Sequence, residues 1–297
     1  MRPAPAGHRI IERWRRPLSP LLSITALSGL LLAAAPTYLL FGEPGTDWVL
    51  LSGAGDVLER MRDIGGVQPT DAAVSPDGKR WAVATRGDGA MPELLLFTSL
   101  AGLPRRIPGR GNVLDGVRFS ADGEWVFFSS NDAEQKKFDK QPMLYAQVYR
   151  VRFGGGLPER LTLSRGCHMW PTPLTNTKLM VSHATCAGGR SLEVLGIDSK
   201  EEAVLLPPDA NIGETAPHPD GRRILFTRTV PAGQEFRVGD LKGSNFALWT
   251  TTPIASTRIR PQWAEGGKAL FFQNNRRIWK LDESGQMARV VDLETSQ

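Results

Sequence analysis

The feature that most constrains the fold is a sequence unit that recurs five times with a period near 45 residues. Each unit has an apolar residue, a Ser-like residue, a turn and then an alternating apolar strand. The units read DAAVSPDGKRWAVAT (71–85), DGVRFSADGEWVFFSS (115–130), PTPLTNTKLMVSH (171–183), ETAPHPDGRRILFTR (214–228) and RPQWAEGGKALFFQN (260–274). Their turn positions Asp77, Asp122, Asn176, Asp220 and Gly266 are 45, 54, 44 and 46 residues apart. This period is typical of the four-stranded blade of a β-propeller.

Local sequence explains why each unit forms a hairpin. An Asp-Gly dipeptide or its equivalent supplies the positive φ values of a tight two-residue turn. The predicted turn residues are Asp77 and Gly78, Asp122 and Gly123, Asp220 and Gly221, and Gly266 and Gly267. After the turn, Trp81 and Val83 point to one face of the strand and Ala82 to the other. Both faces are apolar, as expected of a blade that lies between two neighbouring blades.

The number of blades follows from what precedes the first unit. The segment WVLLSGAGDVLERM (48–61) has the pattern of the outer hairpin of a further blade, with a turn at Gly53-Ala54-Gly55. Its two inner strands have no match at the C-terminus, where the fifth unit already extends to Val291. We therefore expect an all-β fold: a β-propeller with five recognisable four-stranded repeats and a partial sixth made by an N-terminal hairpin. Such a ring is either incomplete or closed by an irregular segment.

Three of the units carry a family resemblance. The runs VSPDGKR, FSADGEW and HPDGRRILF, followed by QVYRVRFGGGLPERLT, resemble the WD-like β-propeller repeat of the TolB family. The resemblance covers about residues 47–297, although the fifth unit has Glu265-Gly266-Gly267 and the third has Thr175-Asn176-Thr177 at the turn. It implies a TolB-like propeller without the N-terminal α/β domain of TolB, for which the chain has no room.

The N-terminal segment predicts a membrane anchor. No charged residue occurs from Pro17 to Gly42, and the stretch from Leu21 to Phe41 is mostly Leu, Ile, Ala and small residues. About twenty such residues form a helix that crosses a bilayer core of roughly 30 Å. Arginines before the stretch and acidic residues after it place the N-terminus in the cytoplasm. We expect residues 1–42 to be a short basic cytoplasmic segment with a single inner-membrane helix, and residues 43–297 to be a periplasmic propeller.

A cleaved signal peptide is the alternative interpretation of this segment. Ala33-Ala34-Ala35 has the small-x-small pattern of a cleavage site. However, Pro36 would follow the cut, and the apolar run continues to Phe41. Both features favour an anchor that is retained.

The high isoelectric point does not indicate nucleic-acid binding. The sequence pI is about 9.4, but residues 1–42 hold five arginines and one glutamate, so they carry most of the net charge of +5. The remaining residues are nearly neutral. A balanced domain has no electrostatic reason to bind phosphate backbones, so we expect no nucleic-acid partner.

The two cysteines flank the inner hairpin of the third unit. Cys167 precedes its first strand and Cys186 follows its second, so antiparallel pairing brings them side by side. We predict a disulfide between them, which an exported domain would retain. Free thiols and a Cys/His metal site with His168 and His183 are the alternatives, but a metal site is awkward because Cys167 and His168 are adjacent in a strand and point to opposite faces. We therefore expect neither a metal nor another cofactor.

An insertion in the second unit is the candidate surface for a partner. The segment NDAEQKKFDKQPMLYAQ (131–147) lengthens the connection between the second and third strands. Long loops on a rigid scaffold commonly carry binding, which makes the following residues candidate partner contacts: Phe138, Met143, Leu144 and Tyr145. A solvated loop is the alternative interpretation.

The sequence contains no recognised catalytic signature. In SPDGKRW (75–81) the glycine directly follows the aspartate, which a hairpin turn requires and an Asp-box does not have. No Gly-x-Ser-x-Gly motif is present, and His218 is expected to be an exposed turn residue. We therefore assign no catalytic residue. The predicted function is a non-catalytic interaction module, anchored in the inner membrane as an accessory subunit of a membrane or envelope protein complex. A small-ligand-binding propeller and a hydrolase or lyase with a channel site are the alternatives.

Overall fold

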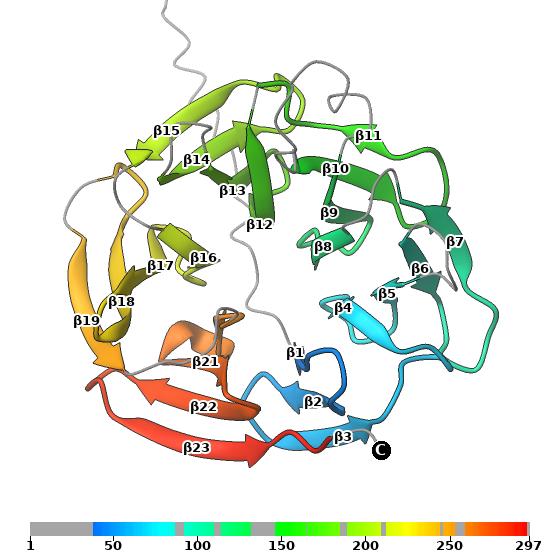
Figure 1. Cartoon of the computed structure of the whole chain (residues 1–297), viewed down its shortest axis with the longest axis horizontal. Coiled ribbons are helices and arrows are strands. Elements are labelled where there is room, and N and C mark those ends of the chain that lie inside the picture. The colour runs from blue at the N-terminus through cyan, green and yellow to red at the C-terminus, as the bar shows by residue number, and fades with distance from the viewer. Residues whose placement is uncertain are drawn as a thin grey trace, which may run out of the picture. The chain divides into compact units, whose positions relative to one another are not determined.

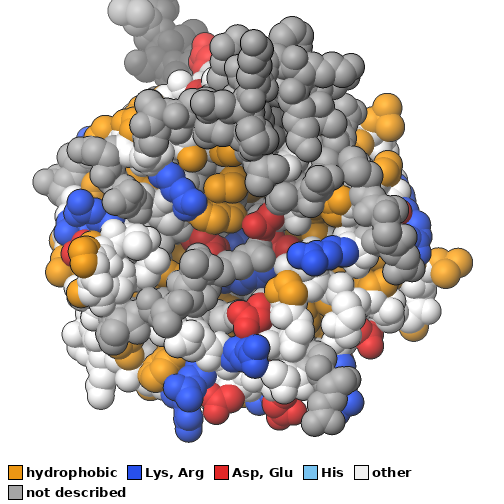
Figure 2. All heavy atoms as spheres, in the orientation of Figure 1, with side chains coloured by type: hydrophobic (Ala, Val, Ile, Leu, Met, Phe, Trp, Pro, Cys, Tyr) orange, Lys and Arg blue, Asp and Glu red, His pale blue; other side chains and the backbone are white. Residues whose placement is uncertain are grey.

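A computed structural model describes residues 38–86, 92–109, 114–131, 146–164, 166–184, 189–208, 212–243, 246–252 and 259–295. These residues form a six-bladed β-propeller, with the blades arranged in chain order around a central axis (Figure 1). The space-filling view has a hollow at this axis, which we call the channel (Figure 2). The all-β prediction is confirmed. Most of the predicted anchor precedes Tyr38 and lies outside the described residues. Within them, no helix has both the length and the apolar character needed to cross a membrane.

Each blade is an antiparallel meander that runs outward from the channel. Blade 1 contains β1 (Tyr38–Phe41), β2 (Trp48–Ser52) and β3 (Val57–Met61). Blade 2 contains β4 (Pro69–Val74), β5 (Trp81–Thr85), β6 (Glu93–Phe97) and β7 (Arg105–Pro108). Blade 3 contains β8 (Leu114–Phe119), β9 (Trp125–Asn131), β10 (Ala146–Arg152) and β11 (Glu159–Arg160). Blade 4 contains β12 (Cys167–Thr175), β13 (Lys178–Ala184), β14 (Arg190–Gly196) and β15 (Glu202–Leu206). Blade 5 contains β16 (Ile212–Pro217), β17 (Arg223–Val230), β18 (Gly233–Asp240) and β19 (Ala247–Thr252). Blade 6 contains β20 (Gln262–Trp263), the 3-10 helix η3 (Glu265–Gly267), β21 (Ala269–Asn274), β22 (Arg277–Asp282) and β23 (Met287–Asp292).

The repeated turn is a four-residue loop, not the two-residue hairpin that the sequence predicted. In blade 2 the N–H of Ser75 donates to the carbonyl of Arg80 at 2.8 Å, which encloses four residues. The Ser75 hydroxyl donates to Asp77 at 2.5 Å and accepts from the N–H of Arg80 at 2.9 Å. Asp77 thus closes the loop through its side chain, and Gly78 alone takes the left-handed conformation, with φ 73°. The other predicted turn glycines, Gly123, Gly221, Gly266 and Gly267, also have positive φ.

Packing between blades confirms that both strand faces are apolar. On β9, Val126 and Phe128 pack against blade 2, whereas Phe127 packs against blade 4. All three side chains are buried. The core of the molecule therefore consists of layers between adjacent blades, and no blade could bury its surface alone.

Blade 1 is larger than predicted, because β1 belongs to it. The strands β2 and β3 are the predicted outer hairpin, but β1 pairs with β2 from Tyr38–Ser52 to Phe41–Val49. Leu39 and Phe41 pack against blade 6, and Leu40 packs against blade 2. Tyr38–Phe41 are therefore a buried strand and not the end of an anchor, and the domain boundary lies before Tyr38 instead of after Gly42. The error has a physical reason, since four consecutive apolar residues suit a membrane helix and a two-sided buried strand equally well.

The C-terminus closes the ring on blade 1. Thr295 forms an antiparallel bridge with Thr46, which lies in the loop between β1 and β2. The N–H of Asp47 donates to the carbonyl of Glu294 at 2.8 Å, and the N–H of Glu294 donates to the Asp47 carboxylate at 2.6 Å. Leu293 is buried in the core between blades 6 and 1. The ring is thus closed by a short segment that follows the last blade.

Candidate functional site

The channel is crossed by a buried ion pair that connects four blades. Asp71 on β4 and Arg260, just before β20, form this pair and are 0% and 2% exposed. The Arg260 guanidinium also lies 4.9 Å from the centre of the Trp48 ring in blade 1. From blade 3, the N–H of Val117 donates to Asp71 Oδ2 at 3.0 Å. The pair therefore fixes blades 1, 2, 3 and 6 relative to one another at the centre of the molecule.

A second set of polar contacts includes the two remaining blades. Glu214 on β16 accepts from the N–H of Ile259 at 3.1 Å, and its other oxygen lies 3.7 Å from Arg118 Nη2 on β8. Thr215 donates to the Thr172 hydroxyl of β12 at 3.3 Å. Acidic and basic side chains are visible in the hollow at the centre of Figure 2. The charged groups described here contact one another, so they act first as links between inner strands.

The sequence held a signal for this network that the motif analysis missed. Asp71, Glu214 and Arg260 occupy the same place in their units, four residues before the Ser-like position. A charged residue at one place of an otherwise apolar repeat indicates a common environment, here the channel wall. Which charges pair across the ring is not visible in the sequence, because Asp71 and Arg260 are 189 residues apart.

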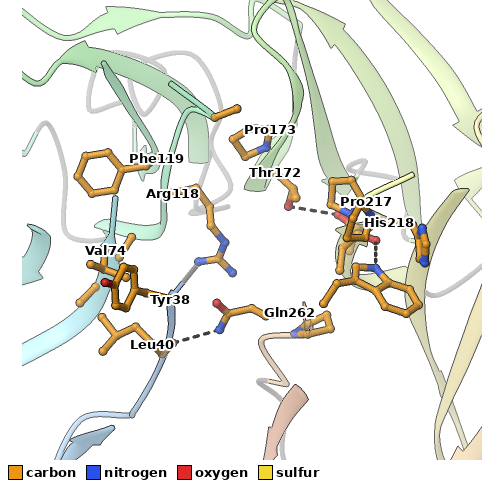
Figure 3. A pocket seen from close by; sticks show the side chains of 18 residues that line it. Tyr38, Leu40, Val74, Arg118, Phe119, Thr172, Pro173, Pro217, His218 and Gln262 are labelled. Atoms are coloured by element: carbon orange, nitrogen blue, oxygen red, sulfur yellow. Dashed lines mark hydrogen bonds between the residues drawn. The ribbon is translucent and has the colours of Figure 1, made fainter. Parts of the chain in front are cut away.

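A cavity of about 180 Å³ lies among the ends of the inner strands (Figure 3). All six blades contribute to its wall: Tyr38 and Leu40, Val74, Arg118 and Phe119, Thr172 and Pro173, Pro217 and His218, and Gln262 and Trp263. We call it the mouth pocket. Its wall is mostly apolar, and Arg118 extends toward its centre in Figure 3. An apolar concave wall with a few polar groups is the usual character of a binding site.

His218 is buried in the wall of the mouth pocket, so the expectation of an exposed turn residue is wrong. It is 6% exposed and lies edge-on against Trp263, with ring centres 4.5 Å apart. Its Nδ1 lies 3.1 Å from the backbone nitrogen and 3.0 Å from the carboxylate of Asp220, and its Nε2 lies 3.0 Å from the carbonyl of Gly267. The turn of blade 6 covers this histidine, which sequence reasoning about a single blade does not reveal.

The aspartate beside this histidine is held in its ionised form. Burial raises the pKa of Asp220, but the backbone N–H of Arg222 and both the side chain and backbone of Arg223 donate hydrogen bonds to it. These bonds outweigh burial and hold the pKa of the Asp220 carboxyl well below its ordinary value of 3.8. The turn of blade 5 is therefore stabilised by a carboxylate rather than by a carboxylic acid.

The structure describes only one of the two cysteines. Cys167 begins β12 and lies opposite Ala184 at the end of β13. Cys186 falls in residues 185–188, outside the described residues, so the disulfide stays a prediction. The same holds for the candidate partner contacts Phe138, Met143, Leu144 and Tyr145, which fall in residues 132–145.

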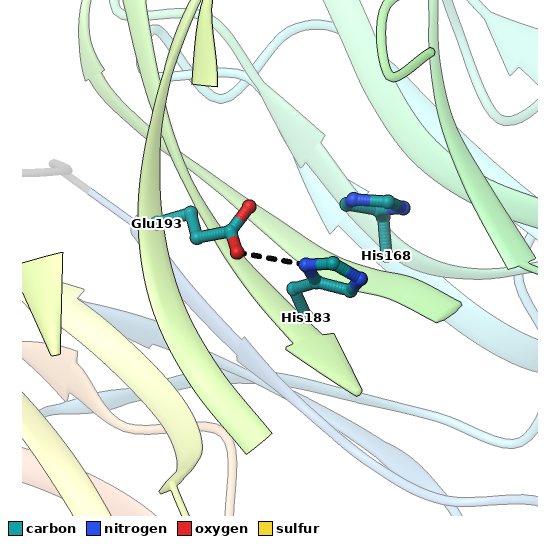
Figure 4. Close-up of side chains that lie close together, drawn as sticks. All are labelled: His168, His183 and Glu193. Carbon is teal, nitrogen blue, oxygen red and sulfur yellow. Dashed lines mark hydrogen bonds and ion pairs between the residues drawn. The ribbon is translucent and has the colours of Figure 1, made fainter. Parts of the chain in front are cut away.

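The neighbouring histidines do converge in blade 4. His168 and His183 are opposite each other in the register of β12 and β13, and their rings stack with centres 4.1 Å apart. Glu193 on β14 lies beside them, with one carboxylate oxygen 2.7 Å from His183 Nδ1 (Figure 4). One donor atom from each residue lies within 4.8 Å of the others, and all three residues are buried. Cys167 and His168 were expected to point to opposite faces of their strand. The two histidines lie on different strands, so this obstacle does not keep them apart.

The fold and the channel define the class of protein: a six-bladed β-propeller whose inner strands are joined by charged and polar side chains. No protein-family model and no curated protein sequence matches the chain. Among solved structures, TolB from Acinetobacter baumannii superposes with a TM-score of 0.53 and 18% identity, over 71% of this chain and 51% of that one. The chain thus spans about half the length of that TolB.

Two further solved structures are similar. A putative TolB from Agrobacterium tumefaciens has a TM-score of 0.52 and 18% identity, over 89% of this chain and 80% of that one. Hydrazine synthase from Kuenenia stuttgartiensis has a TM-score of 0.55 and 16% identity, over 84% of this chain and 75% of that one. The chain therefore has a TolB-like propeller fold, which confirms the predicted resemblance. At these identities the likeness shows the fold alone, and function must be argued from the site.

Proposed function

We propose that this protein is a non-catalytic interaction module that binds an envelope or inner-membrane protein complex as an accessory subunit. The observation that carries the proposal is the mouth pocket, to which all six blades contribute. Because the network around Asp71 and Glu214 links the inner strands, the pocket is preorganised. A preorganised site loses little conformational entropy when a partner binds.

The size of the mouth pocket favours a protein partner over a small ligand. Sites for drug-sized ligands usually enclose about 300–1,000 Å³. A volume of about 180 Å³ is closer to the cavity of roughly 150 Å³ that accommodates benzene. The mouth pocket therefore suits one aromatic or branched aliphatic side chain of a partner.

Arg118 adds a charge preference to this pocket. Its side chain is 24% exposed; Nη1 donates to the Val117 carbonyl at 2.8 Å, and Nη2 lies 3.7 Å from Glu214. Because a guanidinium has five N–H donors, donors remain for a further acceptor. A partial exposure of this kind lets an arginine bind a second carboxylate. The partner segment we propose thus has an apolar side chain next to an acidic one.

The anchor is part of the proposal and rests on the sequence. With β1 assigned to the propeller, the uncharged stretch available for a span is Pro17 to Thr37. A helix of this length measures about 31 Å, close to the roughly 30 Å of a bilayer core. The arginines before it favour a cytoplasmic N-terminus and a periplasmic propeller.

Recovery of partners from detergent-solubilised membranes tests the proposal. Ala121 is half-buried and lines the mouth pocket, so Ala121→Trp would fill the pocket without entering an inter-blade core. We expect this variant and Arg118→Gln to reduce the co-purified partner, identified by mass spectrometry, by at least about tenfold. Leu103→Ser is the matched control, because Leu103 is 99% exposed and lies in the turn between β6 and β7.

Two other outcomes would contradict the pocket assignment. If deletion of residues 133–143 abolishes recovery while Ala121→Trp keeps it, the insertion is the docking arm. If no protein is recovered but a metabolite raises the thermal midpoint of the wild type and not of Ala121→Trp, the protein is a small-ligand binder.

A further inference from the structure

The cluster of His168, His183 and Glu193 lies inside blade 4, away from the mouth pocket. On β13, Leu179 and Val181 pack against blade 3, and His183 continues the same alternation, so it points to the same face. The three side chains come from β12, β13 and β14 (Figure 4). Their exposed fractions are 0%, 9% and 5%. Polar groups this deeply buried need partners or a bound ion.

The contacts of His168 determine which ring nitrogen carries the proton. Ser164 donates its hydroxyl proton to Glu202 Oε2 at 2.5 Å. Its oxygen must then accept from His168 Nε2, which lies 3.0 Å away. His168 Nδ1 is therefore the lone-pair nitrogen. It is buried and has no hydrogen-bond partner within the described residues.

His183 and Glu193 share a proton. Oxygen Oε1 of Glu193 accepts from Ser191 at 3.0 Å and from His183 Nδ1 at 2.7 Å. A metal ion bound by Nδ1 and this carboxylate would take the place of that proton, because ligating imidazole and carboxylate groups are deprotonated.

A carboxylate also orients His168. Glu202 is connected to His168 Nε2 through Ser164 and lies 3.7 Å from that nitrogen. A carboxylate on the far nitrogen of an imidazole is the usual support of a metal-binding histidine, because it sets the tautomer and raises the basicity of the other nitrogen.

We propose that His168 and His183, together with Glu193, bind one Zn²⁺ ion. Two imidazole nitrogens and a carboxylate oxygen are a common protein ligand set for zinc. Ligand atoms of tetrahedral zinc lie about 3.4 Å apart, so donors now within 4.8 Å need to approach by roughly 1.4 Å. The stacked rings must also rotate apart, because a metal lies in the plane of each imidazole. Bound zinc would join β12, β13 and β14 within blade 4.

Zinc binding by the full-length chain in detergent tests this proposal. After treatment with a chelator, the protein is dialysed against Zn²⁺ and the bound metal is counted by elemental mass spectrometry. We expect one zinc per chain in the wild type and none in His168→Gln or His183→Gln. Glu193→Gln should weaken the affinity by about 10–100-fold. His218→Gln is the matched control, because His218 is a buried histidine of blade 5 with its own partners, and it should still bind one zinc.

A measurement on the wild type keeps the test independent of variant folding. X-ray absorption of the zinc-loaded protein should show a nitrogen and oxygen shell at about 2.0–2.1 Å that includes two imidazoles. A sulfur shell near 2.3 Å would instead assign the metal to cysteine and overturn the proposal. The same conclusion follows if the wild type binds no zinc, if His168→Gln binds it as tightly as the wild type, or if His218→Gln also loses it.

Discussion

At the scale of single residues, Asp71 shows how a repeat becomes a closed ring. It contacts Arg260 of the last blade and Val117 of the third, so one carboxylate joins parts of the chain that are far apart in sequence. An ion pair this buried adds little net stability over an apolar pair, but removal of one partner is costly. Its evident contribution is to hold the inner strands in one relative position.

We expect Asp71→Ala to lower the free energy of unfolding by about 3–5 kcal/mol, because it removes the carboxylate opposite the buried Arg260 guanidinium. Urea denaturation measures the change. Arg106→Ala is the control, because the Arg106–Glu93 pair has a similar contact at 2.6 Å but Arg106 is 64% exposed. Its loss should cost at most about 1 kcal/mol. Equal costs for the two variants would contradict the structural role of Asp71.

The lowered pKa of Asp220 predicts that the free energy of unfolding depends on pH. Its pKa is lowered in the folded state, so between that pKa and 3.8 the unfolded chain binds more protons than the folded one. The contribution of Asp220 to the free energy of unfolding is therefore complete at pH values above 3.8, and it is lost as the pH falls through the pKa of the folded state. We expect Asp220→Asn to be less stable than the wild type at pH 6 and to lose less stability between pH 5 and pH 3. Urea midpoints across this pH range check the prediction; parallel curves for the two proteins would refute it.

At the scale of secondary-structure elements, ring closure depends on Asp47 between β1 and β2. Its carboxylate accepts from the N–H of Glu294 at 2.6 Å and from Arg60 at 2.8 Å, and its side chain is 7% exposed. One buried carboxylate thus joins the two ends of the described chain.

We expect Asp47→Ala to cost about 2–3 kcal/mol of unfolding free energy, because it leaves the N–H of Glu294 without its acceptor and the Arg60 guanidinium with only the exposed Glu294 carboxylate. Hydrogen exchange should accelerate in β1 and β23 first. Glu294→Ala is the matched control: that carboxylate is 75% exposed and 3.4 Å from Arg60, so its loss should cost at most about 0.5 kcal/mol. A destabilisation by Glu294→Ala as large as that by Asp47→Ala would indicate that the exposed pair closes the ring.

The inner hairpin of blade 4 carries the disulfide prediction. Cys167 begins β12, and Cys186 follows β13 by two residues. We expect neither cysteine to react with an alkylating reagent when the exported protein is denatured without reductant, and both to react after reduction. A disulfide that closes a loop of about twenty residues stabilises the folded state by roughly 3 kcal/mol in the chain-entropy model. Two labelled thiols before reduction would exclude it.

At the scale of the whole molecule, the anchor prediction concerns what remains attached to the propeller. Since β1 begins at Tyr38, cleavage after Ala35 would leave every described strand intact. The apolar residues of β1 thus no longer argue for a retained anchor, and the prediction rests on Pro36 and on the uncharged stretch before it. We expect the intact mass of the membrane-extracted protein to include the N-terminal segment. A mature chain that starts at Pro36, or one found only in the soluble fraction, would contradict this.

The sequence by itself determined the blades, because an inner hairpin is a local structure. The Ser-x-Asp-Gly turn brings two strands together through bonds within six residues, as at Ser75 and Arg80, and alternating apolar residues show that both faces are covered. Period, turn positions, and the outer hairpin β2–β3 could therefore be predicted from residues close together in the chain.

Only the tertiary structure decided what depends on contacts between blades. Tyr38–Phe41 are a strand because blades 2 and 6 bury them, and His218 is buried because the turn of blade 6 covers it. The mouth pocket exists only when six inner strands converge. His168 and His183 are paired by the register of two strands, and the donor nitrogens follow from Ser164 and Glu193. A sequence pattern specifies how a segment pairs with its neighbour along the chain, whereas burial and charge pairing depend on residues that meet only after the ring has closed.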